Sequence, residues 1–130
     1  MSRPPPDIRD SSGSKSAPRL RLRILFGADV MMGPGKADLL GHIRATGSIS
    51  AAGRAMGMSY KRAWMLVEAM NTAFRNPLVE STRGGQKGGG ARLTDAGAAV
   101  LEHYRRIEAR IAEASADDIA ALGAMLREDD

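Results

Sequence analysis

Residues 47–71 read GSISAAGRAMGMSYKRAWMLVEAMN, and this stretch decides the fold. Small apolar residues follow Ser48 at helical spacing, which favours a capped helix of about two turns. Gly57 permits a sharp turn, after which a second amphipathic segment runs from Tyr60 to Phe74. Because the first segment is rich in small residues, the second can cross it closely. The sequence therefore predicts two helices held at a steep angle by a turn of about three or four residues.

The segments on either side of this unit predict a third helix, a strand and a hairpin. Residues 36–46 have helical spacing and are followed by Gly47, which is typical of a helix C-cap. Residues 19–26 alternate between apolar and basic side chains, which indicates a half-buried strand with a basic outer face. Residues 78–82 and 91–94 are short strand candidates around a Gly-rich basic loop, and they predict a hairpin.

The C-terminal part predicts a long helix with an apolar seam. Thr94 and Asp95 can cap the start of this helix. Its apolar residues then recur at spacings of four, three and four, a two-heptad seam that is typical of helix pairing: Val100, Tyr104, Ile107 and Ile111. A further short helix is expected to follow, joined or kinked near Ser115, with Ile119, Leu122 and Leu126 as its apolar side chains.

Together these elements predict a mainly α fold with a small β-hairpin. The class is a winged helix-turn-helix with a long C-terminal dimerisation helix. Residues 1–18 are rich in Pro, Ser and Gly and are expected to form a flexible N-terminal arm. Residues 19–94 are expected to form the winged helix-turn-helix, and residues 95–130 the C-terminal dimerisation helices.

The charge is divided unevenly along the 130 residues. The net charge of +4 comes from +4 over residues 1–23, +5 over residues 24–94 and −5 over residues 95–130. A basic body followed by an acidic tail indicates that one part meets a polyanion while the other faces water or another chain. Solvated surfaces also carry such imbalances, so charge alone does not establish a nucleic-acid partner.

The composition also indicates the cellular compartment of the protein. The chain has no cysteine, no apolar run long enough for a membrane helix, and no apolar segment near its N-terminus that could act as a signal peptide. We therefore expect a cytoplasmic protein that does not enter a membrane.

The sequence contains no constellation that predicts catalysis. His42 and His103 are the only histidines, and neither has a second ligand at a metal-binding spacing. The segment from Gly33 to Lys36 lacks the earlier glycine and the hydroxyl of a phosphate-binding loop. No catalytic residue, no metal site and no cofactor is predicted, and we do not expect an enzyme.

The start of the second helix of the pair carries the residues that predict DNA binding. A helix reads the major groove through polar side chains near its N-terminus, and here these are Ser59, Tyr60, Lys61 and Arg62. Trp64 can pack against the sugar-phosphate backbone or lie in the core.

The first helix of the pair and the hairpin loop supply further candidates. Ser48 and Ser50 lie where the first helix would approach the DNA backbone, although both can equally be plain caps. In the hairpin loop, glycines around Arg83 and Lys87 allow close approach to phosphates, and the alternative is a solvated loop. The predicted partner is double-stranded DNA.

The run quoted at the outset, followed by PLVES, GGQKGGGARLT and the next helix, resembles the DNA-binding domain of the ModE family of molybdate-responsive regulators. The likeness covers about residues 20–115, and SYKRAW combined with a glycine-rich wing before ARLT is specific to that family. The LysR-type winged helix is a broader relative. The resemblance implies a homodimer whose recognition helix and wing bind a palindromic operator near molybdenum-transport and molybdoenzyme genes.

The resemblance also has a limit. Full-length members of the family continue into an oxyanion-binding domain, whereas the present sequence ends at Asp130 with acidic helical residues. No molybdate site can be assigned, so molybdate binding is not predicted for this chain. Two other functions remain open at this point: a sequence-tolerant architectural DNA binder, and an interaction module that forms heterodimers with a full-length sensor.

Overall fold

The stretch that decides the fold forms a helix-turn-helix. A computed structural model describes residues 17–85 and 88–128, and in it the two helices are α2 (Ile49–Ala55) and α3 (Tyr60–Ala73). Gly57 lies in the turn with φ +72°, a conformation that favours glycine. A Cβ on Gly53 would lie 3.0 Å from the Cβ of Ala63, so the two helices cross as closely as the small residues predicted.

Helix α1 (Pro34–Thr46) precedes this pair and ends where the sequence indicates. Gly47 adopts φ +73°, and its N–H donates to the carbonyl oxygen of Ile43 at 2.8 Å. Helices α1, α2 and α3 enclose most of the core together with α4 (Asp95–Ala114) and the base of the hairpin over residues 79–93. Its buried side chains include Leu39, Leu40, Ile43, Ala52, Ala63, Val67, Met70, Leu78, Val79, Ala91 and Leu101.

The prediction of a strand over residues 19–26 is wrong for its first five residues. Of these residues only β1 (Ile24–Phe26) is a strand, and it pairs antiparallel with β2 (Val30–Met32), a strand not expected from the sequence. Leu22 is half-buried as expected, but Phe26 is 56% exposed. Because β2 is only three residues long, the segment before Ile24 has no strand beside it to supply ladder hydrogen bonds.

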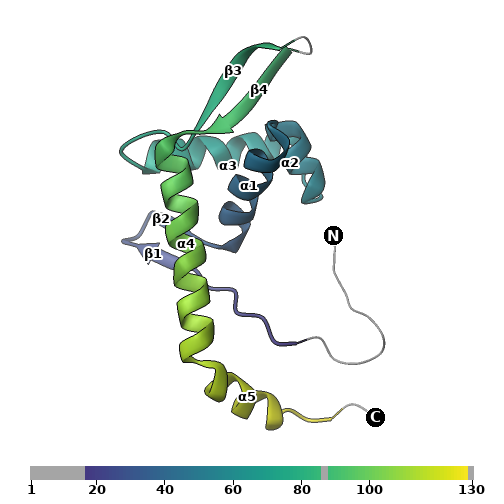
Figure 1. Ribbon diagram of the computed structural model, residues 1–130, viewed down its shortest axis with the longest axis vertical. Helices are drawn as coiled ribbons and strands as arrows, with labels where there is room; N and C mark the ends of the chain where they lie inside the picture. The colour runs from purple at the N-terminus through teal and green to yellow at the C-terminus, as the bar shows by residue number, and fades with distance from the viewer. Residues whose placement is uncertain (1–16, 86–87, 129–130) are drawn as a thin grey trace.

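The second hairpin is present and is longer than predicted. It consists of β3 (Val79–Gly85) and β4 (Gly88–Leu93), with Val79 opposite Leu93 at its base. Figure 1 shows this ribbon projecting from the part of the molecule that holds α2 and α3, while α4 runs away from it. We call this ribbon the wing.

Helix α4 (Asp95–Ala114) begins beside the base of the wing. The hydroxyl of Thr94 accepts a hydrogen bond from the N–H of Gly97 at 3.0 Å and donates to the carbonyl of Pro77 at 2.6 Å. A Cβ on Gly97 would lie 2.0 Å from the carbonyl oxygen of Leu78, so only glycine allows α4 to start this close to the chain.

The predicted break near Ser115 is confirmed. Helix α5 (Ala116–Ala124) follows α4 at this residue, and the Ser115 hydroxyl donates to the carbonyl of Ile111 at 2.6 Å. A flexible arm was predicted for residues 1–18, and residues 1–16 of it lie outside the described residues. Within residues 17–85 and 88–128, no helix combines the length and the hydropathy that a membrane span requires.

Candidate nucleic-acid interface

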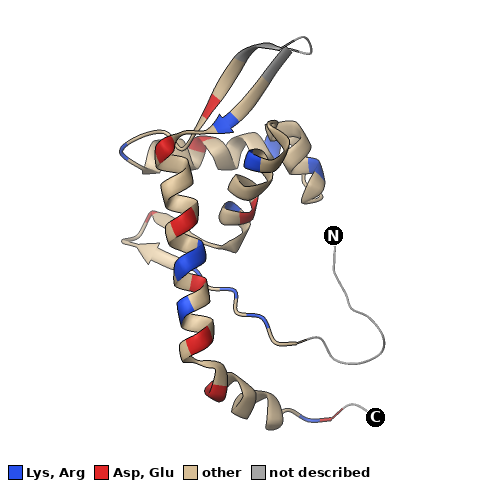
Figure 2. Ribbon diagram, in the orientation of Figure 1, with Lys and Arg blue, Asp and Glu red and all other residues tan. Residues whose placement is uncertain are grey.

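The start of α3 presents the predicted recognition residues on the surface. Tyr60 is 58% exposed, and Lys61 and Arg62 are exposed beside it. Neither basic residue forms an ion pair with another of the described residues. Figure 2 shows basic positions on the helices of the body below the wing. These side chains can therefore meet an external anion without first breaking a salt bridge to another described residue.

Two of the three serines predicted to approach DNA, Ser48 and Ser59, act as helix caps in this structure. The Ser48 hydroxyl accepts a hydrogen bond from the N–H of Ala51 at 3.0 Å, and the Ser59 hydroxyl accepts one from the N–H of Arg62 at 3.1 Å. The Ser50 hydroxyl accepts from Arg54 Nη1 at 2.9 Å. Since an accepting hydroxyl keeps its own proton, each of these groups can still donate to a phosphate oxygen.

A cleft of about 270 Å³ joins these residues to the wing. The cleft brings together the start of α2, the start of α3 and the base of the wing, and its lining residues are Ser48, Ile49, Ser50, Tyr60, Trp64, Ser81, Gly90 and Ala91. Trp64 is 39% exposed and lies at this cleft rather than in the core. Three of the residues predicted from the sequence to approach DNA thus share one surface.

The wing is fixed to the helix-turn-helix at its base. The N–H of Ala91 donates to the carbonyl of Gly47 at 2.9 Å, which ties β4 to the turn between α1 and α2. A Cβ on Gly90 would lie 2.7 Å from Thr82 Oγ1 and 3.0 Å from the Gly47 carbonyl oxygen. Glycine at this position therefore allows the wing to approach the turn.

The structure does not describe the side chains of the two basic residues predicted for the wing. Lys87 lies outside the described residues, as does the side chain of Arg83, whose backbone belongs to β3. Their contact with DNA stays a prediction. The described basic residue of the wing is Arg92, which pairs with Glu80 across the strands at 2.7 Å.

Three exposed residues of α3 were not singled out from the sequence. Met65, Glu68 and Thr72 follow Lys61 at spacings of four, three and four, so they continue its outward face along the helix. Met65 is 58% exposed. The same helical spacing that identified the buried face could have identified them.

The apolar seam of α4 is divided between the core and the surface. Tyr104 is 2% exposed, so it packs inside its own chain, and Val100 is half-buried. Ile107 and Ile111 are 37% and 40% exposed and remain available to a partner. The expectation that Tyr104 lies on a dimerisation surface is corrected, because the first hairpin and the segment before it cover this side of α4.

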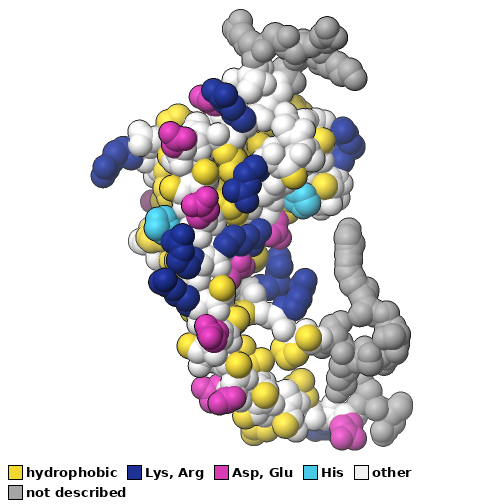
Figure 3. All heavy atoms as spheres, viewed as in Figure 1, with side chains coloured by type: hydrophobic (Ala, Val, Ile, Leu, Met, Phe, Trp, Pro, Cys, Tyr) yellow, Lys and Arg dark blue, Asp and Glu magenta, His cyan; other side chains and the backbone are white. Residues whose placement is uncertain are grey.

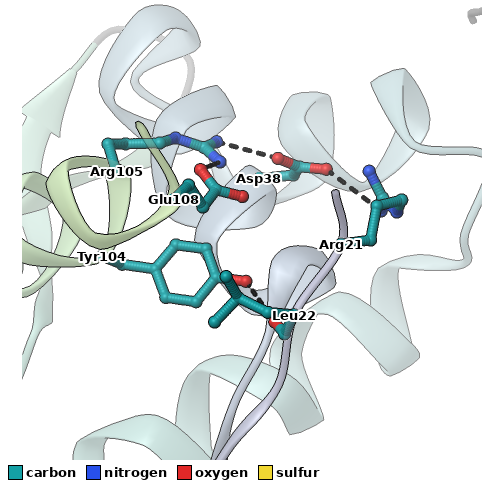
Figure 4. A network of polar contacts seen from close by, with 6 residues as sticks. All are labelled: Arg21, Leu22, Asp38, Tyr104, Arg105 and Glu108. Carbon is teal, nitrogen blue, oxygen red and sulfur yellow. Dashed lines mark hydrogen bonds and ion pairs between the residues drawn. The ribbon is translucent and has the colours of Figure 1, made fainter. Parts of the chain in front are cut away.

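A polar network holds α4 against α1 and the N-terminal segment (Figure 4). The Tyr104 hydroxyl donates to the carbonyl of Leu22 at 2.5 Å. Arg105 donates to Asp38 at 2.8 Å and to Glu108 at 3.0 Å, and Arg21 lies 3.8 Å from Asp38. These contacts set the direction in which α4 leaves the body.

We expect Tyr104→Phe to lower the free energy of unfolding by about 1 kcal/mol near neutral pH, because the hydrogen bond to Leu22 is lost. Burial, with a smaller contribution from Glu108, raises the pKa of the Tyr104 phenol above its ordinary value of 10.0. Since the folded-state pKa exceeds the unfolded one, this stabilisation is complete below pH 10 and is lost as pH rises through the folded-state pKa.

Denaturant unfolding followed by circular dichroism between pH 8 and the alkaline limit of folding measures both effects. The decline in stability above pH 10 should be shallower in Tyr104→Phe than in the unmodified chain. Tyr60→Phe is the matched control, because it keeps Tyr104 and should keep the original decline. An unchanged decline in Tyr104→Phe would contradict the assignment.

The fold and the sequence together define the class of this protein. Residues 38–98 match the bacterial regulatory helix-turn-helix proteins of the lysR family. The chain thus contains a LysR-type winged helix-turn-helix DNA-binding domain, a kind of domain that is typically not enzymatic. Among solved structures, the Multiple Antibiotic Resistance Repressor, MarR, shares this fold with a TM-score of 0.53 and 16% identity, over 72% of this chain and 73% of MarR.

More particularly, the chain is homologous to the N-terminal part of the ModE proteins, as its motifs predicted. It is 49% identical over 82 residues to the molybdenum-pterin-binding protein MopB of Rhodobacter capsulatus, covering 63% of this chain and 30% of MopB. It is 42% identical over 71 residues to the DNA-binding transcriptional dual regulator ModE of Escherichia coli (strain K12), covering 55% of this chain and 27% of that regulator. The chain therefore spans about 30% of the length of these curated relatives.

Proposed function

We propose that this chain is a sequence-specific transcriptional regulator that binds a palindromic operator as a homodimer. The observation that carries this proposal is the exposed start of α3, where Tyr60, Lys61 and Arg62 stand beside a wing whose base is bonded to the helix-turn-helix. An exposed polar helix start is what entry into the major groove requires.

Recognition divides between two kinds of contact. The starts of α2 and α3 direct backbone N–H groups and the Ser48 and Ser59 hydroxyls toward phosphates, which sets the register of the protein on the duplex. Lys61 and Arg62 reach base edges or phosphates from the same helix start, and Met65 and Glu68 continue the outward face. Arg83 and Lys87 contact the neighbouring groove from the wing.

Dimerisation supplies the symmetry of the operator. Ile107 and Ile111 are exposed on α4, and pairing of this helix with its symmetry mate would remove both from water. Tyr104, which is buried within its own chain, lies beneath this surface. A two-fold axis between the copies then fixes the half-site spacing near one or more turns of DNA.

The genes that we propose as targets are taken from the names of the relatives. Homologues include the molybdenum transport protein ModE of Herbaspirillum seropedicae, 43% identical over 72 residues. We propose operators near molybdenum-transport or molybdoenzyme genes on this ground.

Selection of sheared genomic DNA on the purified chain, at low and near-physiological salt, tests the proposal. We expect a palindrome that is still enriched at the higher salt concentration, whether or not molybdate is added. Uniform recovery of all fragments, lost as salt rises, would instead indicate the sequence-tolerant binder, because non-specific affinity comes from counterion release. A palindrome recovered only when a full-length relative is added would indicate the heterodimer.

A further inference from the structure

An apolar groove lies between the β1–β2 hairpin and α4. It has a volume of about 220 Å³, and its walls include Ile24, Phe26, Phe74, Val100, His103 and Ile107. Phe26 is 56% exposed and Ile107 is 37% exposed. We call this site the hairpin groove. Apolar side chains that stay in contact with water in this way favour an apolar occupant.

Helix α5 presents an apolar face that no other part of the chain described by the structure covers. None of its residues is buried, and Leu122, Met125 and Leu126, at and just beyond its C-terminal end, are 65%, 80% and 66% exposed. Figure 3 shows hydrophobic side chains gathered over this helix. A helix of nine residues is marginal in water, so packing against another surface is needed to stabilise it.

The hairpin groove of the same chain is out of reach of this face. Ser115, where α5 begins, lies eight residues beyond Ile107, which corresponds to about 12 Å along α4. Figure 1 places α5 at the far end of α4 and the β1–β2 hairpin beside the middle of α4. To enter its own groove, α5 would have to reverse direction at Ser115. A second copy of the chain has no such constraint.

The exposed seam of α4 places a second copy in register with the groove. An antiparallel pair of α4 helices centred on Ile107 and Ile111 has its midpoint at residue 109. Position 115 of the partner then lies opposite His103, because both are six residues from that midpoint. The partner's α5 thus starts beside the α4 wall of the hairpin groove.

The charges favour the same arrangement. The first turn of α5 carries Asp117 and Asp118. Parallel pairing of α4 brings these acids of the two copies together, where like charges repel, whereas antiparallel pairing places them opposite Leu101 and Val100 and keeps the two acidic ends apart.

We propose that, in the dimer, α5 of each copy packs into the hairpin groove of the other copy. This inference rests on the homodimer proposed above and specifies what holds it together. The exchanged helix buries Leu122 against the groove and covers Phe26.

Disulfide trapping between two variants tests the exchange, since the natural chain has no cysteine. Phe26→Cys and an affinity-tagged Leu122→Cys are purified under reducing conditions, mixed, and oxidised at a protein concentration where native mass spectrometry shows dimers. We expect a tagged–untagged disulfide dimer, because the exchanged helix covers Phe26. Leu25→Cys replaces Phe26→Cys in the control, because Leu25 is 64% exposed and successive side chains of a strand point to opposite faces.

The outcomes separate this inference from the homodimer itself. Dimers without a mixed disulfide above the Leu25 control, or with Leu122-to-Leu122 disulfides dominating, overturn the exchange and leave the homodimer standing. Monomers at every concentration overturn both. An intrachain disulfide in a monomeric Phe26→Cys/Leu122→Cys double variant also overturns the exchange.

A second variant measures the energy of the contact. Leu122→Ser should raise the dimer dissociation constant at least about tenfold, because an exchanged helix buries this leucine twice per dimer. Ala121→Ser, at the neighbouring exposed position, should leave the constant unchanged. Equal dissociation constants for the two variants would overturn the proposal.

Discussion

Gly97→Ala is expected to lower the free energy of unfolding by about 3 kcal/mol or more, since the new methyl group has no space. Its Cβ would lie 2.0 Å from the carbonyl oxygen and 2.9 Å from the carbonyl carbon of Leu78. Leu78 is fully buried, and its carbonyl accepts the N–H of Thr94 at 2.9 Å, so it cannot retreat without breaking the start of α4. The gain of about 1 kcal/mol in helix propensity is smaller than this clash. Urea unfolding followed by circular dichroism measures the difference.

Gly35→Ala is the matched control for this substitution. Gly35 also lies in a helix, α1, but a Cβ there would meet no atom within 4 Å. We expect a change of less than about 1 kcal/mol in either direction. If Gly97→Ala were as stable as Gly35→Ala, the close packing of α4 on Leu78 would be wrong.

Lys61→Ala and Arg62→Ala are each expected to weaken binding to the selected operator by about 5- to 150-fold, equivalent to about 1–3 kcal/mol. Both side chains are exposed at the start of α3, where a docked helix meets base edges and phosphates. Because neither contributes to the core, each variant should unfold within about 0.5 kcal/mol of the unmodified chain. Fluorescence anisotropy with labelled operator DNA at several salt concentrations gives the affinities.

Arg75→Ala controls for the loss of one positive charge. Arg75 is exposed just beyond the other end of α3, so its removal changes the net charge equally but leaves the helix start intact. We expect at most a small loss of affinity with no change in sequence preference. Operator affinity that is unchanged in both Lys61→Ala and Arg62→Ala would remove α3 as the recognition helix.

Much of the fold follows from local signals in the sequence. Ser48, Ser59 and Thr94 cap three helices because each hydroxyl accepts an N–H three residues later. Gly47 ends α1 and Gly57 turns the chain between α2 and α3. Both adopt positive φ, a conformation that favours glycine. These effects depend only on neighbouring residues, so sequence patterns reveal them.

The elements that depend on distant partners were harder to predict. The alternation of residues 19–26 correctly indicated that Leu22 turns inward, but Phe26, expected on the same face, is 56% exposed. A strand also needs a partner of equal length, which this segment lacks. The spacing of Tyr104 and Ile107 marks an apolar side of α4 without indicating what covers it. Tyr104 is covered by its own chain, whereas Ile107 remains partly exposed.

The candidate site was predictable at its helix starts and less so elsewhere. Polar residues that follow a turn at the start of a helix can be recognised from the sequence alone, which is why Tyr60 and its basic neighbours were found. Met65 was missed because an exposed apolar side chain in an amphipathic pattern gives no sign of function. The cleft that joins Ser48 to Ser81 depends on the wing folding back, which sequence spacing does not encode.

The backbone of Gly47 has a consequence for how such a DNA-binding domain can evolve. Its N–H donates to the last turn of α1 and its carbonyl accepts the N–H of Ala91, so the wing is tied to the helix-turn-helix through backbone atoms. Substitutions of the outward side chains of α3 leave those bonds untouched. A duplicated copy of this gene could therefore acquire a new target sequence through a few changes at Lys61, Arg62 or Met65 while inheriting its architecture intact.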